Sequence, residues 1–414
     1  MFLPNRNDLH RQPLDAADAE TLGIAGADTV ERFLAHRDNH RMTPLHALPA
    51  LAGELGLGTL HVKDEGFRLG LGSFKALGGA YAVFRLVLEE AGKRLGRPVD
   101  VGDLDRPDVR SVAATMTVAC ATDGNHGRSV AQGAELTGAK AVIFVHAGVS
   151  DERIAAIARC GARMVRVEGN YDDSVRQAAK VAAEKGWTVV SDTSWPGYER
   201  IPGLVMQGYT AIVREALRQL REPPTHVFVQ AGVGGVAAAV AGHLAIVLGD
   251  ARPTFIVVEP ARAACVVAAA VAGRVVKVAH DEPTVMAMLE CYEASPVAWR
   301  VLARVADAFM TVDEDDAVTV MRRLARPSGG DPVIVAGESG GVGLAGLIRA
   351  VAENKAELGL DGKSRVLVIN TEGATDPSRY AGLVGMSPAE VLAGKLAVEA
   401  KLAVEAKLAV EAMP

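Results

Sequence analysis

The sequence has no long run of basic residues and no long apolar run. Its 414 residues include 44 Lys and Arg against 50 Asp and Glu, which gives a formal net charge of −6. Binding to nucleic acid needs clustered Lys and Arg, so we expect no nucleic-acid partner. No stretch reaches the roughly 18 apolar residues of a membrane span, and residues 1–18 lack the apolar core of a secretory signal. These absences predict a cytoplasmic protein without a membrane partner.

Cysteine is also scarce, with four widely spaced residues and no C-x-x-C pair: Cys120, Cys160, Cys265 and Cys291. This spacing predicts no zinc site, and we expect no metal. Reduced thiols in the core of a cytosolic protein are the simplest interpretation. A pairing of Cys265 with Cys291 is the disulfide to examine first.

What is present is a large apolar fraction, 49% against 23% charged residues, in a chain long enough for two or three domains. From about residue 110, apolar strands alternate with segments of helical spacing. We predict strands at 111–119, 139–146, 162–169, 187–194, 225–230, 254–260 and 365–370. Continuous apolar strands separated by helices indicate an α/β fold with parallel sheets covered on both faces.

A Pro-Gly break at residues 196–197 divides the two α/β series. We predict a large domain from residues 1–84 plus 197–392, because the apolar strand LHVKD near residue 60 fits the second series. Residues 85–196 would form a smaller domain. The last segment, 393–414, contains three KLAVEA repeats and is expected to be a peripheral helix without chemistry.

The segment GSFKALGG, residues 72–79, places a lysine, Lys75, among small and apolar neighbours. A solvated surface charge at the start of a helix remains an interpretation of Lys75 taken alone. Gly78 and Gly79 would let another group approach the backbone closely. A lysine in a dry site has a lowered pKa, and its neutral amine can attack a carbonyl to form a Schiff base. We therefore consider Lys75 a candidate nucleophile.

A second Gly-rich segment, AGVGG, lies between a predicted strand and a predicted helix at residues 231–235. The backbone N–H groups of such a loop bind phosphate. Gly232, Gly234 and Ala237 also have the G-x-G-x-x-A spacing of a dinucleotide site. Glu259, at the end of the next strand, would then bind the ribose. Glycines that serve only core packing are the alternative.

The segment ATDGNHG, residues 121–127, also follows a strand and opens a helix. Asn125 and His126 would lie at the carboxyl end of the strand, where open α/β sheets bind ligands. A surface turn is the alternative. A lysine nucleophile, a phosphate loop and a second anion-binding loop together predict a phosphorylated aldehyde, pyridoxal 5′-phosphate (PLP), as cofactor.

Four segments carry a resemblance to a known family: SFKALGGAYA, TDGNHGR, AGVGGVAAAV and TEGATD. They look like the tryptophan-synthase-β-like, fold type II PLP enzymes, and among these they most resemble the diaminopropionate ammonia-lyases. The resemblance covers roughly residues 40–385. It implies two open, twisted, mainly parallel-sheet domains with the active site in the cleft between them. It also implies a homodimer that eliminates ammonia from L-2,3-diaminopropionate to give pyruvate, with the D-isomer as a further candidate substrate.

The resemblance also implies roles for individual residues. Lys75 would bind the PLP aldehyde, Asn125 the ring 3′-hydroxyl, and Thr371 would face the pyridine nitrogen. A neutral hydroxyl there favours elimination over transamination, because it does not force a protonated ring. The backbone amides that would hold the phosphate are those of Gly232, Val233, Gly234 and Gly235. The residues that would contact the substrate are Thr122, Asp123, Gly124, His126 and Asp192.

Asp123 departs from the pattern of most relatives, which have Ser at this position. A carboxylate beside the substrate carboxylate costs about 4 kcal/mol at 4 Å and an effective dielectric of 20. The position makes sense if the substrate carries a second ammonium, or if Asp123 is an acid or base. Lys75 would remove the Cα proton from the L-isomer, and Asp123 could remove it from the opposite face of the D-isomer. Asp192, after another strand, would meet the substrate amine, unless it only caps a turn.

Three other functions fit parts of the sequence. A serine or threonine dehydratase of the same fold would expel hydroxide instead of ammonia, and Asp123 argues against it. An NAD-dependent oxidoreductase would use the AGVGGVA loop and Glu259, but it leaves Lys75 unexplained. A binding protein without activity on this fold would not need the lysine and both loops.

Overall fold

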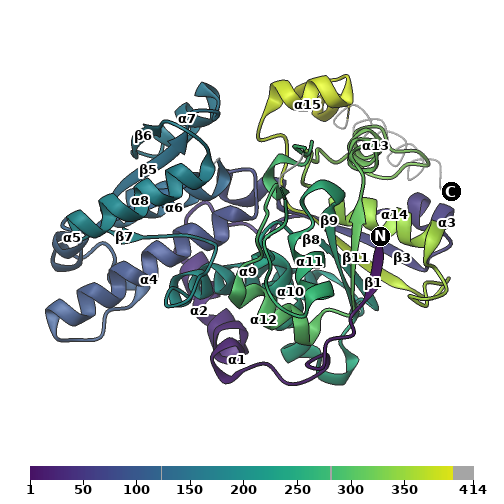
Figure 1. Cartoon of the computed structure of the whole chain (residues 1–414), viewed down its shortest axis with the longest axis horizontal. Helices are drawn as coiled ribbons and strands as arrows, with labels where there is room; N and C mark the ends of the chain where they lie inside the picture. Colours follow the sequence, from purple (N-terminus) through teal and green to yellow (C-terminus); the bar gives the residue numbers. More distant parts are fainter. Residues whose placement is uncertain (123, 280–281, 395–414) are drawn as a thin grey trace, which may run out of the picture.

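The larger of two sheets has seven strands and forms the right-hand lobe of Figure 1. The computed structural model describes residues 1–122, 124–279 and 282–394. The five central strands are parallel, and the outermost strands, β1 and β2, are antiparallel to their neighbours. Their spatial order is β1 (Phe2–Pro4), β10 (Ala308–Val312), β9 (Thr254–Pro260), β8 (His226–Gln230), β11 (Arg365–Asn370), β3 (Thr59–Asp64) and β2 (Leu45–Ala47).

Both faces of this sheet are covered, because side chains alternate along each strand. In β8, Val227 and Val229 belong to one hydrophobic core, and Phe228 belongs to another. The first core includes residues of α9 (Arg200–Gln219), α10 (Gly235–Leu248) and α12 (Pro296–Val305). The second includes residues of α3 (Pro49–Leu55), α13 (Glu314–Ala325) and α14 (Val342–Glu353). Two-sided coverage explains why the strands read as continuous apolar runs.

The smaller sheet has four parallel strands and lies in the left-hand lobe of Figure 1. Its order is β6 (Arg163–Val167), β5 (Lys140–His146), β4 (Thr117–Ala121) and β7 (Thr188–Val189). One face packs on α8 (Tyr171–Lys185). The other packs on α4 (Lys75–Leu95) and α6 (Asn125–Thr137) and shares the core that extends to the larger sheet. The predicted fold class, α/β with mainly parallel sheets, is confirmed.

Helix α4 joins the two lobes, and two of its glycines explain how. A Cβ on Gly78 would lie 2.6 Å from the ring of Tyr209 in α9, and one on Gly79 would lie 2.8 Å from the Ser129 hydroxyl in α6. Both distances are shorter than van der Waals contact. The two glycines therefore let α9 and α6 pack closely on α4. This helix packing accounts for the close approach to the backbone that the sequence predicted at both glycines.

Several predicted elements match the structure, and one does not. Ser150 and Asn170 cap α7 (Asp151–Ala158) and α8 through side-chain hydrogen bonds. The apolar strand near residue 60 pairs with β11 in the larger sheet. The strand predicted at 111–119 begins too early, because α5 (Pro107–Ala113) takes its first three residues and β4 starts only at Thr117.

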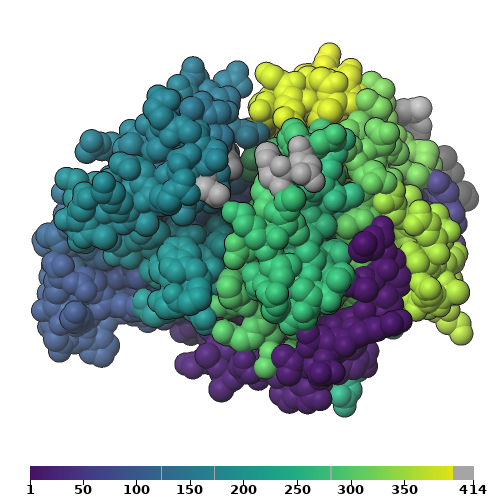
Figure 2. Space-filling model, in the orientation of Figure 1, coloured from purple at the N-terminus to yellow at the C-terminus, as the bar shows by residue number. Residues whose placement is uncertain are grey.

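The remaining helices are α1 (Ala16–Leu22), α2 (Ile24–Ala35), α11 (Cys265–Ala272) and α15 (Pro377–Val384). The predicted domain limit between residues 84 and 85 falls inside α4. We propose two domains, one around each sheet, and Figure 2 shows the two corresponding lobes side by side. The KLAVEA repeats lie outside the described residues. Within the described part of the chain, no helix combines the length and apolar character needed to cross a membrane.

Candidate active site

Lys75 is the first residue of α4, and the end of β11 fixes the segment before it. The Phe74 N–H donates to the Thr371 carbonyl over 2.9 Å, and Ser73 forms a β-bridge with Glu372. Gly72 has a φ of 76°, a left-handed conformation that a side chain would strain. The strand end and the glycine turn together place Lys75 beside the carboxyl ends of the parallel strands.

A buried charge network holds the segment that leads to this turn. Arg68 donates to Glu65 and to Glu215 of α9, each over 2.7 Å, and Lys63 of β3 donates to Glu215 over 2.7 Å. All four side chains are buried. The next residue, Leu69, has a φ of 49°, which is unusual for a leucine. The network therefore fixes a strained bend at Leu69, six residues before the catalytic lysine candidate.

The Lys75 amine forms an ion pair with the carboxylate of Asp192, 117 positions further along the chain. Burial alone would lower the pKa of Lys75, but Asp192 and Tyr209 outweigh it, and the pKa lies above its ordinary value. The expectation of a lowered lysine pKa is therefore wrong for this state of the site. Burial likewise opposes ionisation of Asp192, but Lys75 and His126 hold its pKa below the usual range. The site thus contains a charged acid–base pair.

His126 lies on the other side of Asp192, with its Nδ1 3.9 Å from the carboxylate. Its Nε2 contacts the Val190 carbonyl at 3.0 Å. Burial lowers the pKa of His126 despite the nearby carboxylate, which favours a neutral imidazole at pH 7. Lys75, His126 and Asp192 were each predicted as site residues, and the structure brings them together.

The predicted phosphate loop joins β8 to α10. Gly234 has a φ of 95°, and a Cβ on Gly232 would lie 3.0 Å from the sulfur of Cys291. The loop carbonyl of Val233 accepts from the Ser295 N–H over 2.9 Å. Gly235 begins α10, so the N–H groups of this first helical turn have no acceptor from a preceding turn of the helix. Such a helix start carries a partial positive charge and suits a phosphate.

Glu259 does not have the position that a dinucleotide site requires. Its buried carboxylate accepts from the N–H groups of Val266 and Val267, over 2.8 and 2.6 Å, at the start of α11. Burial raises the pKa of Glu259 to about 8, even with these hydrogen bonds. The residue is a helix cap, which removes the acceptor that the NAD alternative needed. The structure holds the cysteines as thiols, so the Cys265–Cys291 disulfide is not formed.

The ATDGNHG loop contains a threonine that organises a turn and a buried asparagine. The Thr122 hydroxyl accepts from the N–H groups of Gly124 and Gly127, each over 3.1 Å, so it organises the turn into α6. Asn125 begins α6 and is buried. Asp123 lies outside the described residues, and its predicted role stays a prediction.

Glu372 is a buried carboxyl group that the sequence reasoning missed. Its Oε2 accepts from the Asn125 amide over 2.6 Å, and its Oε1 has no hydrogen-bond partner. Burial, followed by the charge of nearby Glu338, raises the pKa of Glu372 to about 8. The adjacent Thr371 hydroxyl accepts from Gln230 over 2.8 Å. Glu372 belongs to the TEGATD segment. Its contact with Asn125, 247 positions earlier in the chain, is visible only in the structure.

The residues present fit PLP. Buried polar atoms without a hydrogen-bond partner gather near Lys75, namely Ser73 Oγ, His126 Nδ1, Tyr209 OH and Glu372 Oε1. Buried polar groups are normally hydrogen-bonded, so this set indicates a missing polar ligand. An amine, a helix start for a phosphate and an amide for a ring hydroxyl complete the chemistry that PLP needs. No sequence signal pointed to Tyr209, which lies inside α9.

A cavity of about 380 Å³ lies beside this site. Gly72, Gly124 and Asn125 are among the residues that line it, and Gly72 lies three residues before Lys75. Arg128, Arg153 and other charged residues line it further out. The volume falls within the range of small-molecule pockets.

The fold and this site are those of a PLP-dependent enzyme, and the family described as "Pyridoxal-phosphate dependent enzyme" matches residues 36–372. The curated diaminopropionate ammonia-lyase of Escherichia coli strain K12 is 41% identical over 83% of this chain and 87% of its own length. That of Salmonella typhimurium strain LT2 is 39% identical over 84% and 88%. The chain therefore belongs to the diaminopropionate ammonia-lyase family, which confirms the resemblance and the cofactor inferred from the sequence.

Solved structures agree with this assignment. The E. coli diaminopropionate ammonia-lyase in complex with an aminoacrylate–PLP azomethine reaction intermediate has a TM-score of 0.83 and 37% identity, over 93% of this chain and 96% of that one. Threonine deaminase isoform 2 from Solanum lycopersicum has a TM-score of 0.68 at 19% identity, which shows a shared fold only.

Proposed function

We propose that the protein removes ammonia from 2,3-diaminopropionate by PLP-dependent α,β-elimination and releases pyruvate and a second ammonia. The protein is a carbon–nitrogen lyase by its family membership. The observation that carries the substrate proposal is the Lys75–Asp192 pair. It supplies both a base for a Cα proton and an anion for a second ammonium group.

PLP supplies an aldehyde that binds amines covalently and a ring that delocalises the electron pair left at Cα. The residues that would hold it are Lys75 at the aldehyde, Gly232–Gly235 at the phosphate, Asn125 at the 3′-hydroxyl and Thr371 facing the pyridine nitrogen. Glu372 accepts one N–H of Asn125, so the second N–H of the same amide is left to donate to the ring oxygen. Glu372 thus orients Asn125.

As a free amine, Lys75 would remove the Cα proton of the L-isomer. Asp192 binds the β-ammonium of the substrate, because a carboxylate of lowered pKa stays charged and attracts it. An amine leaves far more readily as ammonia from its protonated form, so an anion that stabilises the ammonium promotes departure. His126, beside Asp192, contributes a neutral imidazole next to the substrate.

We further propose that Asp123 acts as the base for the D-isomer, from the face opposite Lys75. The neighbouring Thr122 hydroxyl accepts from the Gly124 N–H. The family resemblance implies that Asp123 takes the position of a serine that, in most relatives, meets the substrate carboxylate. A second ammonium on the substrate compensates the repulsion that this carboxylate causes. We also propose a cytoplasmic homodimer, in keeping with the family resemblance.

A product assay tests the proposed function. Purified holoenzyme is given L- and D-2,3-diaminopropionate, L-serine and L-threonine, and pyruvate, 2-oxobutyrate and ammonia are measured. We expect two ammonia per pyruvate from diaminopropionate and at least tenfold lower kcat/KM for serine and threonine. Efficient formation of 2-oxobutyrate from threonine would instead establish a dehydratase.

A further inference from the structure

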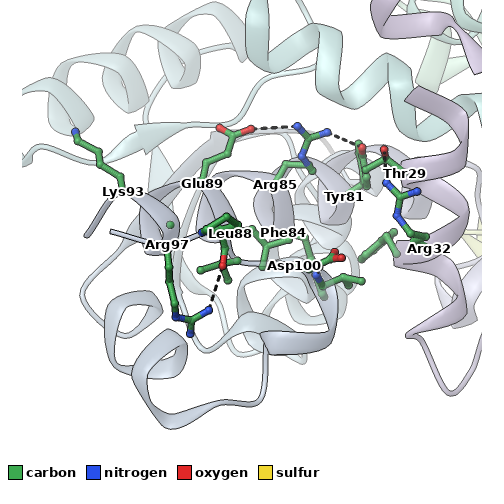
Figure 3. Close-up of a pocket in the computed structure, with 15 residues that line it drawn as sticks. Thr29, Arg32, Tyr81, Phe84, Arg85, Leu88, Glu89, Lys93, Arg97 and Asp100 are labelled. Atoms are coloured by element: carbon green, nitrogen blue, oxygen red, sulfur yellow. Dashed lines mark hydrogen bonds and ion pairs between the residues drawn. The ribbon is translucent and has the colours of Figure 1, made fainter. Parts of the chain in front are cut away.

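A second cavity, of about 470 Å³, lies between α2, the second half of α4 and the segment 97–101 (Figure 3). Arg85 and Glu89, which line it, follow Lys75 in α4 by 10 and 14 residues. At 1.5 Å per residue, they lie about 15 and 21 Å further along the helix axis. The cavity is therefore separate from the site around Lys75.

The floor of this cavity is aromatic and apolar. The ring of Phe33 contacts those of Tyr81 and Phe84 edge-on, with centroids 5.5 and 4.5 Å apart. All three residues are buried, and Leu88 and Val99 continue the lining as half-buried side chains. A flat or branched apolar group would pack on these rings and remove the exposed part of Leu88 and Val99 from water.

The rim carries more positive than negative charge. Arg32, Arg85, Lys93 and Arg97 line the cavity, against Glu89 and Asp100. In Figure 3, Arg32 and Arg85 lie at the Tyr81 end, while Lys93 extends away from the other labelled side chains.

The two arginines at the Tyr81 end differ in their present partners. Arg85 donates to the Tyr81 hydroxyl over 2.9 Å and to Glu89 over 3.3 Å. Arg32 is exposed and donates to the neutral hydroxyl of Thr29 over 3.0 Å. A guanidinium has five N–H donors, so Arg32 retains donors for an anion.

We propose that this cavity binds a small monocarboxylate with an aromatic or branched apolar body. The apolar body would lie on Phe84 and Leu88, and Arg32 would take the carboxylate in a two-pronged hydrogen bond. Glu89 and Asp100 on the same rim disfavour ligands with several negative charges, such as phosphate esters. A volume of about 470 Å³ is within the range of small-ligand sites.

Isothermal titration calorimetry of the holoenzyme with phenylacetate tests the proposal. Phenylacetamide and phenethylammonium are ligands of the same shape without the negative charge, and phenyl phosphate tests the preference for a monoanion. We expect phenylacetate to bind with a Kd on the order of 1 mM. The other three should bind at least about tenfold more weakly, because they lack the charge or carry too much of it.

Variants locate the binding. Arg32→Ala, at an exposed position, should weaken phenylacetate binding about tenfold, and Leu88→Trp should abolish it by filling the cavity. Arg94→Ala is the matched control, because Arg94 is an exposed arginine of α4 that pairs with Glu90 and does not line the cavity. It should leave binding unchanged. Absence of saturable binding, or equal binding to the parent and to Arg32→Ala, would overturn the proposal, and so would equal binding of phenylacetamide.

Discussion

Glu215→Gln offers a quantitative test of the buried network that supports the lysine segment. The Glu215 carboxylate accepts from Lys63 over 2.7 Å, from Arg68 over 2.7 and 2.8 Å, and from the Thr43 N–H over 3.2 Å. An amide keeps the shape but removes the charge. Lys63 and Arg68 would then share a single anion, Glu65. Removing one partner of a buried ionic network costs about 3–5 kcal/mol.

The stability difference between the parent and Glu215→Gln should also depend on pH. Burial opposes the charge of Glu215, but hydrogen bonds and attraction from Arg68, and then Lys63, lower its pKa from 4.5 to about 2. Because its pKa is lower in the folded state, ionised Glu215 stabilises the fold at pH values above 4.5. This stabilisation is lost as the pH falls toward 2. The change corresponds to about 3 kcal/mol. The stability gap between parent and variant should therefore shrink between pH 5 and pH 3.

Urea unfolding monitored by far-UV circular dichroism, at pH 7 and at several lower pH values, measures this gap. Glu90→Gln is the control, because Glu90 forms an exposed ion pair with Arg94 within α4 and should change stability by less than about 1 kcal/mol. If Glu215→Gln costs no more than this control at pH 7, or if the gap does not change with pH, the reasoning is refuted.

Three further substitutions test the catalytic assignments. Asp192→Asn should lower kcat/KM for diaminopropionate by about 10²–10⁴-fold with the cofactor still bound, and activity close to that of the parent would exclude a role in catalysis. Asp123→Asn should reduce kcat/KM more for the D-isomer than for the L-isomer, and an equal loss would reject the second base. Because the pKa of Glu372 is raised to about 8, the parent should lose stability as pH rises from 4.5 to 8. Thermal melts at pH 5 and pH 8 should show a smaller loss of stability for Glu372→Gln than for the parent. An identical loss in both proteins would contradict a buried, protonated Glu372.

Much of the fold was predictable because local signals and periodicity agreed. The continuous apolar strands indicated parallel sheets, and the structure has two mainly parallel sheets. The strand predicted at 111–119 begins too early because a short apolar run does not distinguish a strand from a buried helix. There, Pro107 begins α5, a proline in the first turn of a helix.

The candidate site was predictable where residues belong to short segments and unpredictable where chemistry depends on distant contacts. Lys75 and Asp192 were each identified, but their pairing across 117 residues reversed the expected direction of the lysine pKa. Tyr209 and Glu372 were missed because a buried polar residue inside a helix or after a strand has no periodic signature. Only the structure shows that Tyr209 OH and Glu372 Oε1 are buried without a hydrogen-bond partner, which indicates a polar ligand.

The central claim is that Lys75 is the residue that binds PLP, and borohydride reduction followed by peptide mapping tests it most directly. Reduction converts a lysine–PLP link into a stable secondary amine, which mass spectrometry then locates. The account predicts a single phosphopyridoxyl group on Lys75, and none on the protein when Lys75→Ala is treated in the same way. A modification on another lysine, such as the buried Lys63, or a fully active enzyme without any modified lysine, would contradict it.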